Sequence, residues 1–443
     1  MSGHQTICVQ PAGDDEPLRE HDVLVIGGGP GGSTIAALLA EQGRSVVVLE
    51  KDRHPRFHIG ESLLPFNVPL LERLGVLAEV QRIGMPKFGI EFVSPQHAKS
   101  SFLEFSNGWH RDMHYSFQVR RAEFDHVLLR NAERKGAVIV EGCRVTAVEF
   151  PPTGGVEVQS MRDDGRATAW RARFLVDASG RDAFVAGKLR IKRRNRRHQS
   201  AAIFGHFSDA ERLPGRAAGN ISIFWFTHGW FWFIPLSDGT TSVGVVCHPD
   251  YLRRREVDVT EHFLQQIALC PALAARLQRA TLTQAATGTG NYSYNCERMH
   301  GERYILIGDA AGFIDPVFST GVYLAMHGAF LGADAVATCL DQPARAHQAM
   351  RRFEKELRGC VARFSWFIYR ITHPATRSLF MTPRNYLRLE EAVLALLSGD
   401  VDANSPIRSR LTLFKALYYV KVTFARLLRL FSSDSDMVDP QRG

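Results

Sequence analysis

A glycine-rich loop near the N-terminus has the spacing of a phosphate-binding turn. Gly27, Gly29 and Gly32 form the pattern G-x-G-x-x-G between a short apolar run and a run of helix-forming residues. Glycines at these positions allow a tight turn, a close approach of the backbone to a pyrophosphate, and close packing of the following helix. Glu50 ends the next apolar run, where an acidic side chain can bind a ribose hydroxyl. Together these residues predict a dinucleotide-binding site.

Two later apolar runs end in acidic residues that could serve the same site. One run covers residues 174–176 and ends in Asp177, and the other covers 304–307 and ends in Gly308 and Asp309. The carboxylate of Asp309 could accept a hydrogen bond from a ribityl hydroxyl. The helix predicted after Asp309 could present backbone N–H groups to a flavin ring, because the first N–H groups of a helix have no partner within it.

The stretch 230–235, Trp-Phe-Trp-Phe-Ile-Pro, alternates two indoles with two phenyl rings. Because side chains alternate across a strand, Trp230 and Trp232 are expected on one face. Strands of this composition are usually buried in the core of a sheet. Beside a flavin, the same pair of indoles could instead form a wall of the active site.

Three predicted elements must position the glycine loop. Residues 22–26 are predicted as a buried strand, the helix runs from the loop through Ala40, and residues 45–49 are predicted as a second strand. This order is the context that the glycine pattern requires. Gly288 and Gly290 lie outside such a context, so the sequence predicts no second dinucleotide-binding domain.

The composition is that of a globular protein, with 443 residues of which 45% are hydrophobic and 23% are charged. The net charge of +8 favours anionic partners. Seven scattered cysteines without a C-x-x-C pair argue against a metal site or a disulfide framework, and predict a cytoplasmic location. Residues 1–20 are polar, resemble no signal peptide and are predicted as a disordered extension. No uninterrupted apolar run is long enough for a membrane span.

Residues 22–367 resemble the flavin-dependent halogenases, within the larger group of flavoprotein monooxygenases. The likeness rests on residues 57–65, on the Trp-x-Trp-x-Ile-Pro stretch 230–235, and on residues 313–321. It implies an α/β fold in which a Rossmann-like FAD-binding domain is interleaved with an antiparallel-sheet substrate domain. A C-terminal helical region completes the implied fold, and FAD is the implied dinucleotide.

The resemblance implies a division of the chain into four parts. The predicted parts are an extension at 1–20, an FAD-binding domain at 21–84, 110–188 and 285–345, a substrate-side sheet domain at 85–109 and 189–284, and a helical region at 346–443.

The resemblance gives roles to Lys87 and to the tryptophans. In the family, reduced FAD and O2 oxidise chloride or bromide to hypohalous acid, which travels to the substrate. Lys87 matches the lysine that holds this oxidant, since an ammonium can hydrogen-bond it and a desolvated amine could form a chloramine. On spacing alone, a lysine beside a proline is more often a solvated loop residue. Trp230 and Trp232 match a barrier that keeps the substrate away from the flavin.

The halide and cofactor sites follow from the same resemblance. Ser319, Thr320 and Gly321 match the halide site, because N–H groups at the start of a helix suit an anion. The alternative is an ordinary helix cap. The expected cofactor-binding residues are Gly27, Gly29, Gly32, Glu50, Lys51, Ser62, Arg121, Asp309 and Gly312.

The chain is most similar to the family branch that acts on phenolic or pyrrolic rings, often tethered to an acyl carrier protein. Tryptophan-specific members have a glutamate before the Ser-Thr-Gly segment, and this chain has Phe318 there. The implied function is FADH2-dependent chlorination or bromination of an electron-rich ring in secondary metabolism, such as antibiotic biosynthesis. A separate flavin reductase would supply the FADH2.

The run 192–198 contains five lysines and arginines. It is either a solvated loop or, given the family, a surface that attracts an acidic carrier protein. No nucleic-acid-binding motif accompanies it, so we expect no nucleic-acid partner.

A helix is predicted over residues 407–431. Its apolar stripe comprises Leu413, Leu417, Val420, Phe424, Leu427 and Phe431, and its cations on the other face are Arg408, Lys415, Arg426 and Arg429. Such a helix packs on the body of the protein, or contacts a membrane surface or another subunit. The aromatic residues Phe364, Trp366, Phe367 and Tyr369 could line the substrate cavity.

Two other functions remain open at this point. A flavin hydroxylase or a reductase of isoprenoid double bonds can have the same fold. A flavin- or carrier-binding scaffold without turnover is the third possibility.

Overall fold

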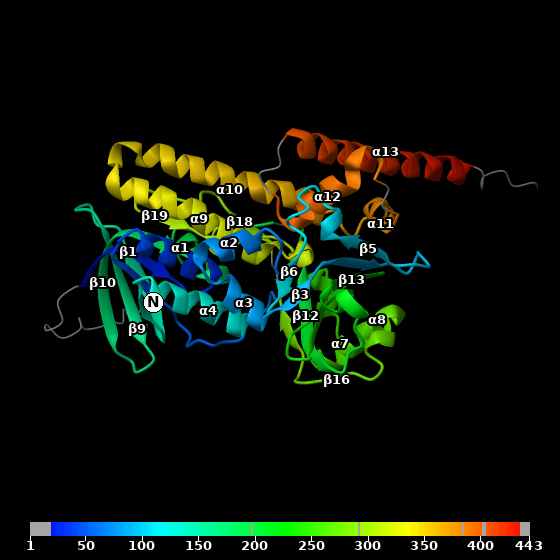
Figure 1. Ribbon diagram of the computed structural model, residues 1–443, viewed down its shortest axis with the longest axis horizontal. Coiled ribbons are helices and arrows are strands. Elements are labelled where there is room, and N and C mark those ends of the chain that lie inside the picture. The colour runs from blue at the N-terminus through cyan, green and yellow to red at the C-terminus, as the bar shows by residue number, and fades with distance from the viewer. Residues whose placement is uncertain (1–18, 196–197, 291–292, 383–384, 401–404, 435–443) are drawn as a thin grey trace, which may run out of the picture.

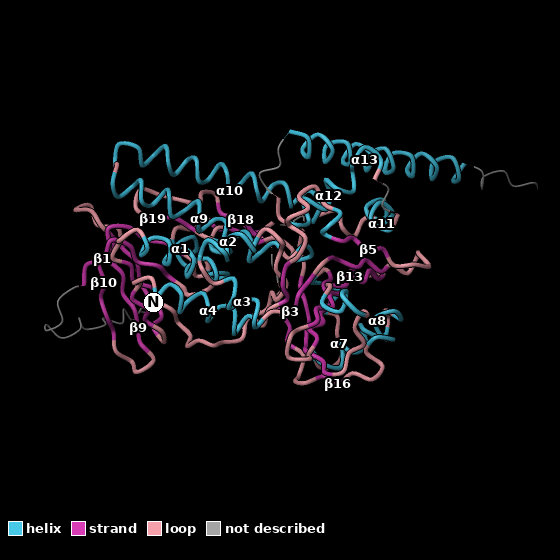
Figure 2. The backbone as a smooth tube through the Cα atoms, viewed as in Figure 1, coloured by secondary structure: helices cyan, strands magenta, loops and turns pink. Residues whose placement is uncertain are grey.

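The computed structural model describes residues 19–195, 198–290, 293–382, 385–400 and 405–434. Two sheets lie side by side, and long helices run along one edge of the molecule (Figure 1). The backbone tube shows helices packed beside the strands of the first sheet, and a second group of strands that is accompanied by the short helices α7 (Val259–Ala268) and α8 (Pro271–Arg276) (Figure 2). The predicted N-terminal extension lies outside the described residues, except that Arg19 and Glu20 already belong to the first strand.

The first sheet is mainly parallel and contains the glycine loop. Its members are β1 (Arg19–Ile26), β2 (Val46–Leu49), β7 (Val138–Val140), β8 (Cys143–Glu149), β9 (Val156–Arg162), β10 (Ala167–Asp177) and β19 (Tyr304–Leu306). The order is β7-β2-β1-β10-β9-β8, and β19 pairs with β10. β1 pairs in parallel with β2 and β10, whereas β8 and β9 form an antiparallel extension. The apolar runs at β1 and β2 are continuous because helices cover both faces of a parallel sheet.

Helices pack around this sheet. They are α1 (Pro30–Glu41), α2 (Asn67–Leu74), α3 (Leu77–Ile83), α4 (Arg121–Arg134), α5 (Phe184–Lys188), α9 (Thr320–Asp341) and α10 (Ala346–Ile368). α1 lies against α4 and α9, and α9 lies against α10. Among the described residues, α9 alone is long and apolar enough to cross a membrane, and 56% of its most apolar window is buried inside the fold.

The second sheet is mainly antiparallel and contains the tryptophan strand. Its members are β4 (Gly89–Val93), β5 (Ser101–Glu104), β12 (Ala201–Ser208), β13 (Ile221–Phe226), β14 (Gly229–Pro235), β15 (Thr241–Cys247), β16 (Thr281–Leu282) and β17 (Thr287–Thr289). The order is β16-β12-β15-β14-β13-β4-β5, with β17 beside β12. The helices α6 (Pro249–Arg253), α7 (Val259–Ala268) and α8 (Pro271–Arg276) follow β15 in the chain.

The two faces of β14 pack into different cores. Phe231 and Phe233 belong to a cluster with Phe263 of α7. Trp230 and Trp232 belong to a cluster that extends into the C-terminal helices. The predicted alternation is therefore present, with the two indoles on one face.

Two small sheets and several 3-10 turns connect the larger elements. β3 (Met85–Lys87) pairs with β6 (Ser116–Gln118), and β18 (Tyr294–Cys296) pairs with β11 (Lys192–Arg194) and β20 (Gly312–Phe313). The 3-10 turns are Phe105–Asn107, Gly180–Asp182, Gly215–Gly219, Gly308–Ala310, Pro316–Phe318, Pro343–Arg345 and Tyr386–Arg388. The start of the basic run is thus a strand rather than a loop, and residues 196–197 lie outside the described part.

The C-terminal region comprises α11 (Pro374–Met381), α12 (Leu389–Ser398) and α13 (Ser405–Asp434). The packed face of α13 is formed by Ile407, Leu411, Phe414 and Tyr418. The expectation that the predicted stripe packs on the body is wrong beyond Leu413. Leu417, Val420, Phe424 and Leu427 are exposed, and Lys415 instead lies over the Trp366 ring. Nothing is described of the side chains of Arg429 and Phe431. Figure 1 shows the end of α13 extending past the rest of the fold.

The α/β fold with an interleaved antiparallel sheet and C-terminal helices is as expected. The exact division of the chain into domains stays a prediction.

Candidate active site

A cavity of about 700 Å³ lies at the carboxyl ends of β1, β2 and β10. Ligands of open α/β sheets bind at this edge, because the loops after the strands diverge there. The cavity extends from the glycine loop to the tryptophan strand β14 and to the start of α9. It therefore joins the predicted cofactor, barrier and halide residues in one space.

Most predicted site residues line this cavity. Those in its wall are Gly27, Gly29, Glu50, Lys51, Ser62, Arg121, Trp230, Trp232, Asp309, Ser319 and Gly321. Gly32, Lys87, Gly312 and Thr320 are not in the wall. Gly32 and Lys87 nevertheless contact residues that are.

The glycine loop has the geometry that its pattern predicts. Gly27 has φ +96°, which favours glycine, and a Cβ atom on Gly32 would lie 1.9 Å from the carbonyl oxygen of Gly27. Gly29 precedes α1, whose first N–H groups point out of the helix end. The loop can therefore present backbone donors to a pyrophosphate.

Glu50 is held at the end of β2. Its Oε2 accepts a hydrogen bond from the Gly28 N–H at 2.6 Å, and its Oε1 accepts one from the Asp52 N–H at 2.9 Å. Lys51 forms an ion pair with Asp182 at 2.6 Å across the cavity rim. This acid, the glycine cradle and the volume fit the nucleotide half of FAD, and Asp309 beside the start of α9 fits the ribityl half.

Arg121 lines the cavity, but the protein uses most of its donors. The guanidinium donates to Asp125 at 2.7 and 2.9 Å, and to the carbonyl oxygens of Ile59 and Gly60 at 3.1 and 3.3 Å. The charge of Arg121, followed by burial, lowers the pKa of His58 to about 4. Arg121 thus fixes the segment that leads to Ser62.

Lys87 is fully buried behind the cavity wall. Its Nζ donates to Ser62 Oγ and to the Leu63 carbonyl oxygen, both at 3.0 Å, and lies 5.4 Å from the centre of the Phe105 ring. Burial lowers the pKa of Lys87 to about 7. It is therefore not the solvated loop residue that its spacing alone favoured. Ser62 is the link between Lys87 and the cavity.

The tryptophans form a fixed wall of the cavity. The ring centroids of Trp230 and Trp232 are 6.1 Å apart, and Trp232 Nε1 donates to Ser242 Oγ at 3.1 Å. A Cβ atom on Gly244 of β15 would lie 2.2 Å from the Trp232 ring, so this glycine is required for the indole to lie flat on the sheet.

The Ser-Thr-Gly segment begins α9. Ser319 has φ +57°, and Thr320 is the first residue of the helix. Ser319 and Gly321 face the cavity, whereas Thr320 is 1% exposed. Free N–H groups at this helix start suit a halide. Phe318, before the segment, packs on Phe380 of α11, with ring centroids 6.3 Å apart.

The predicted aromatic wall is only partly near the barrier. Phe364 and Phe367 share a buried cluster with both tryptophans of β14. Trp366 instead meets Tyr418 of α13 edge to face. Tyr369 accepts a hydrogen bond from Asn195.

Several cavity residues were missed by sequence reasoning. Glu61 lines the cavity and contacts His206, and Arg56 and Arg181 add positive charge to the wall. Glu61 lies within the stretch 57–65, on which the family resemblance partly rests. His206 has no sequence signal, because it comes close to Glu61 only through the pairing of the second sheet.

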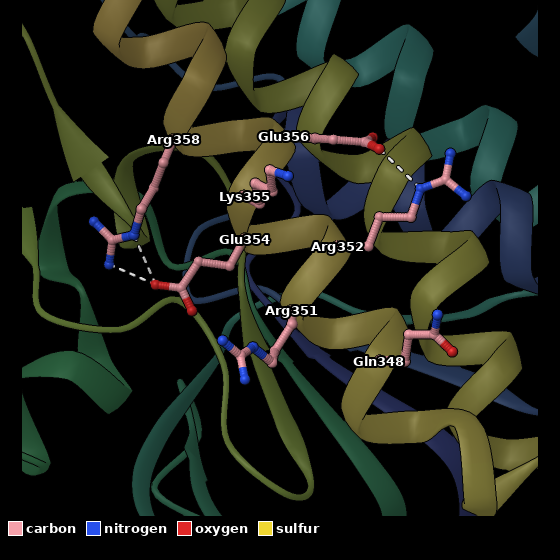
Figure 3. A pocket seen from close by; sticks show the side chains of 7 residues that line it. All are labelled: Gln348, Arg351, Arg352, Glu354, Lys355, Glu356 and Arg358. Carbon is pink, nitrogen blue, oxygen red and sulfur yellow. Dashed lines mark hydrogen bonds and ion pairs between the residues drawn. The ribbon is translucent and has the colours of Figure 1, made fainter.

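A second hollow, of about 740 Å³, lies on the surface of α10. Arg352 pairs with Glu356 and Arg358 with Glu354, while Arg351 and Lys355 extend beside them (Figure 3). None of the predicted site residues lines this hollow. Within the described ranges, no group of three histidine, cysteine or acidic side chains is placed to hold a metal.

The geometry defines an FAD-binding α/β flavoprotein. In agreement, residues 20–363 match the family model described as an FAD binding domain. The chondrochloren halogenase CndH, a myxobacterial FAD-dependent halogenase, has a TM-score of 0.76 and 34% identity, with 88% of this chain and 92% of that chain covered.

Curated relatives point to the same reaction. A flavin-dependent halogenase of Armillaria mellea is 34% identical, with 77% of this chain and 70% of the relative covered. A 1H-pyrrole-2-carbonyl peptidyl-carrier-protein chlorinase of Pseudomonas fluorescens is 28% identical, with 86% and 90% covered. A tryptophan 2-halogenase of Chondromyces crocatus is 34% identical, with 72% and 61% covered. The chain belongs to the flavin-dependent halogenases, oxidoreductases that use FAD, O2 and a halide.

Proposed function

We propose that this protein chlorinates or brominates a phenolic or pyrrolic ring, with Lys87 as the catalytic lysine. The contact between Lys87 and Ser62 carries the proposal, because Ser62 also lines the flavin cavity. When bound, reduced FAD would donate two electrons to O2, and the oxygen species so formed would oxidise the halide by two electrons. A separate flavin reductase supplies the reduced cofactor.

Residues of the chain itself bind the halide, keep the substrate away from the flavin and position the oxidant. The backbone N–H groups of Thr320 and Gly321, at the start of α9, hold the halide by charge and hydrogen bonding, whereas the Ser319 N–H already donates to the Pro316 carbonyl oxygen at 2.9 Å. Trp230 and Trp232 occupy the space in which an aromatic substrate would otherwise meet the flavin. Lys87 binds the halogen oxidant through its Nζ and aligns it with the ring carbon. A pKa of about 7 gives Lys87 both a donor form and a neutral form at neutral pH.

The substrate class is proposed from the residue before the halide segment. The phenyl ring of Phe318 cannot remove a proton, so the substrate ring must lose its own proton readily after halogenation. Phenols and pyrroles do so because the O–H or N–H group of the cationic intermediate is acidic enough to lose its proton to water, without a base placed at the ring carbon. This argues against free tryptophan, although one relative is a tryptophan halogenase.

The activity is tested with reductase, NADH, FAD, O2 and chloride or bromide, on phenols, pyrroles and tryptophan. The proposal expects halogenated phenol or pyrrole from the wild type and none from Lys87→Ala. If neither protein halogenates any substrate, free or carrier-bound, the proposal is wrong. Fast reduction of bound FAD by NADPH, without a reductase, would favour a hydroxylase or an isoprenoid reductase instead.

Carrier-bound substrate is the preferred form. The cations Arg351 and Lys355 on α10 form no ion pair with the residues that the structure describes, and Arg358 connects α10 to the backbone of β18 next to β11. A basic surface of this kind attracts an acidic carrier protein. A carrier-bound pyrrole should be halogenated with a higher kcat/KM than the free acid, and the difference should shrink at high salt.

The free end of α13 is the proposed membrane or subunit contact. Leu417, Val420, Phe424 and Leu427 are exposed, and Lys421 and Arg426 flank them. Co-sedimentation with anionic vesicles tests the membrane contact, and a measurement of the oligomeric state tests the subunit contact. No disulfide joins the described cysteines, which suits a cytoplasmic enzyme.

A further inference from the structure

Glu61 and His206 form a buried acid–imidazole pair in the cavity wall. His206 Nε2 lies 2.8 Å from Glu61 Oε1. The side chain of Glu61 is 3% exposed and that of His206 is 12% exposed. Glu61 lines the flavin cavity, and its Oε2 has no hydrogen-bond partner among the described residues. The pair therefore extends from the cavity toward the surface.

The groups around His206 set its charge. Phe57 covers the ring edge to face, with centroids 5.9 Å apart. Asp238 and Arg120 form an ion pair at 3.3 Å, and the charges of both influence the pKa of the imidazole. Burial by itself would lower the pKa of His206, but the hydrogen bond and charge of Glu61, with Asp238, raise the pKa overall. Arg120 opposes them. The net effect of these groups favours the protonated form of His206.

The halogenation reaction consumes protons inside the cavity. One aromatic C–H, one halide, one reduced flavin anion, one O2 and two protons give one aromatic C–halogen bond, one oxidised flavin and two waters. Two electrons come from the flavin and two from the halide, and both oxygen atoms leave as water. The cavity therefore needs a route by which protons enter.

Three of the other titratable groups at or behind the cavity wall are less suited to this task. Both carboxylate oxygens of Glu50 already accept backbone hydrogen bonds. His58 is neutral at neutral pH because its pKa is lowered to about 4. Lys87 reaches the cavity through Ser62.

We propose that His206 and Glu61 relay protons from solvent to the oxygen atoms released in the flavin cavity. His206 takes a proton on the ring nitrogen that faces away from Glu61 and donates the Nε2 proton to Glu61 Oε1. Rotation of the Glu61 carboxyl group by half a turn directs this proton into the cavity, where it passes to an oxygen and leaves the carboxylate. A half-turn of the imidazole ring then returns its N–H to the side of Glu61 and completes the cycle. The relay rests on the flavin-dependent oxidation of the proposed function, and not on the identity of the aromatic substrate.

The test compares Glu61→Gln and His206→Gln with a matched pair elsewhere. Glu354 and His300 also form an acid–imidazole pair, at 3.2 Å, and neither lines the flavin cavity. Glu354→Gln and His300→Gln are therefore the controls. Circular dichroism and FAD titration verify that each variant folds and binds the cofactor.

Two readouts separate the relay from a purely structural role. In flavin-free protein, NMR titration of the histidines should show a lower pKa for His206 in Glu61→Gln and no change in Glu354→Gln. Reoxidation of reduced FAD by O2 in the presence of halide is followed by stopped flow. In both relay variants, the step of reoxidation that consumes protons should be at least about tenfold slower than in the wild type at pH 8. Added imidazole should restore the rate in His206→Ala but not in Glu61→Gln.

The outcomes distinguish this inference from the proposed function. Wild-type reoxidation rates and pH profiles in both relay variants would overturn the relay, whatever substrate is used. A wild type that reoxidises FAD normally but halogenates no ring would overturn the proposed function and leave the relay result standing.

Discussion

The flavin cavity and the Lys87 site meet at Ser62 but are built in different ways. Backbone shapes the cavity, through the glycine loop, the ends of parallel strands and the start of α9. Side-chain packing shapes the Lys87 site, where the amine is 0% exposed beside Phe105. A backbone-built site follows from local sequence patterns. A packed site depends on residues from several elements, so we expect the two to respond differently to substitution.

Lys87→Ala should give the largest effect, and it should impair the Lys87 site without impairing the flavin cavity. Loss of the lysine should lower halogenation about 100- to 10,000-fold, the range seen for positioned catalytic groups. FAD affinity should change less than about twofold, since Lys87 is not in the cavity wall. Product analysis and flavin fluorescence measure the two effects. Lys99→Ala, at an exposed lysine between β4 and β5, is the control, and equal loss of FAD binding and activity would contradict the separation.

Gly32→Ala should impair the flavin cavity, to which the glycine loop belongs. Its Cβ would meet the Gly27 carbonyl oxygen at 1.9 Å, and relief of such a clash costs about 1–3 kcal/mol. FAD affinity should therefore fall about 10- to 100-fold, measured by fluorescence titration. Gly187→Ala, with nothing within 4 Å of its Cβ, should bind FAD like the wild type. Unchanged affinity in Gly32→Ala would show that the loop does not hold the cofactor.

Gly244→Ala should weaken the barrier between the two sides. The new methyl group must displace the Trp232 ring, from which it would lie 2.2 Å away. We expect about three- to tenfold less halogenated product per flavin oxidised, a cost near the low end for overpacking. Tryptophan fluorescence should shift as well. Gly288→Ala adds a methyl group in open space and is the control. A shifted spectrum with unchanged product yield would argue against a barrier role.

Lys87→Met should alter the pH dependence of stability. The unfolded chain keeps the lysine proton up to pH 10.5, whereas the folded chain releases it near pH 7. The free energy of unfolding of the wild type should therefore rise as the pH increases from about 7 to 10.5. Below pH 7 the folded protein bears the full cost of burying the charged ammonium. The variant should exceed the wild type in Tm at pH 6 by on the order of a few degrees. The gap should close toward pH 10.

The exposed lysine Lys421 provides the control for this pH test. Lys421→Met should shift Tm by a similar small amount at every pH. If the gap between Lys87→Met and the wild type is constant with pH, Lys87 is not buried as the structure describes.

Local sequence patterns were enough to predict the backbone-built part of this protein. The spacing of Gly27, Gly29 and Gly32 before a helix, and Glu50 after the next strand, predicted the cofactor loop because each role depends on near neighbours in the chain. Alternation in β14 likewise predicted one indole face. The family resemblance added Lys87 and Ser319–Gly321, whose catalytic and halide roles stay predictions.

Which distant side chains meet became visible in the folded structure alone. It brought His206 to Glu61 across 145 positions of sequence, and sealed Lys87 behind Ser62. It also buried Ile407, Leu411 and Phe414 of α13 in place of the predicted stripe. The physical reason is common to these cases. An apolar or polar pattern shows that a face exists, but its partner depends on how distant elements pack, and packing is a property of the whole fold.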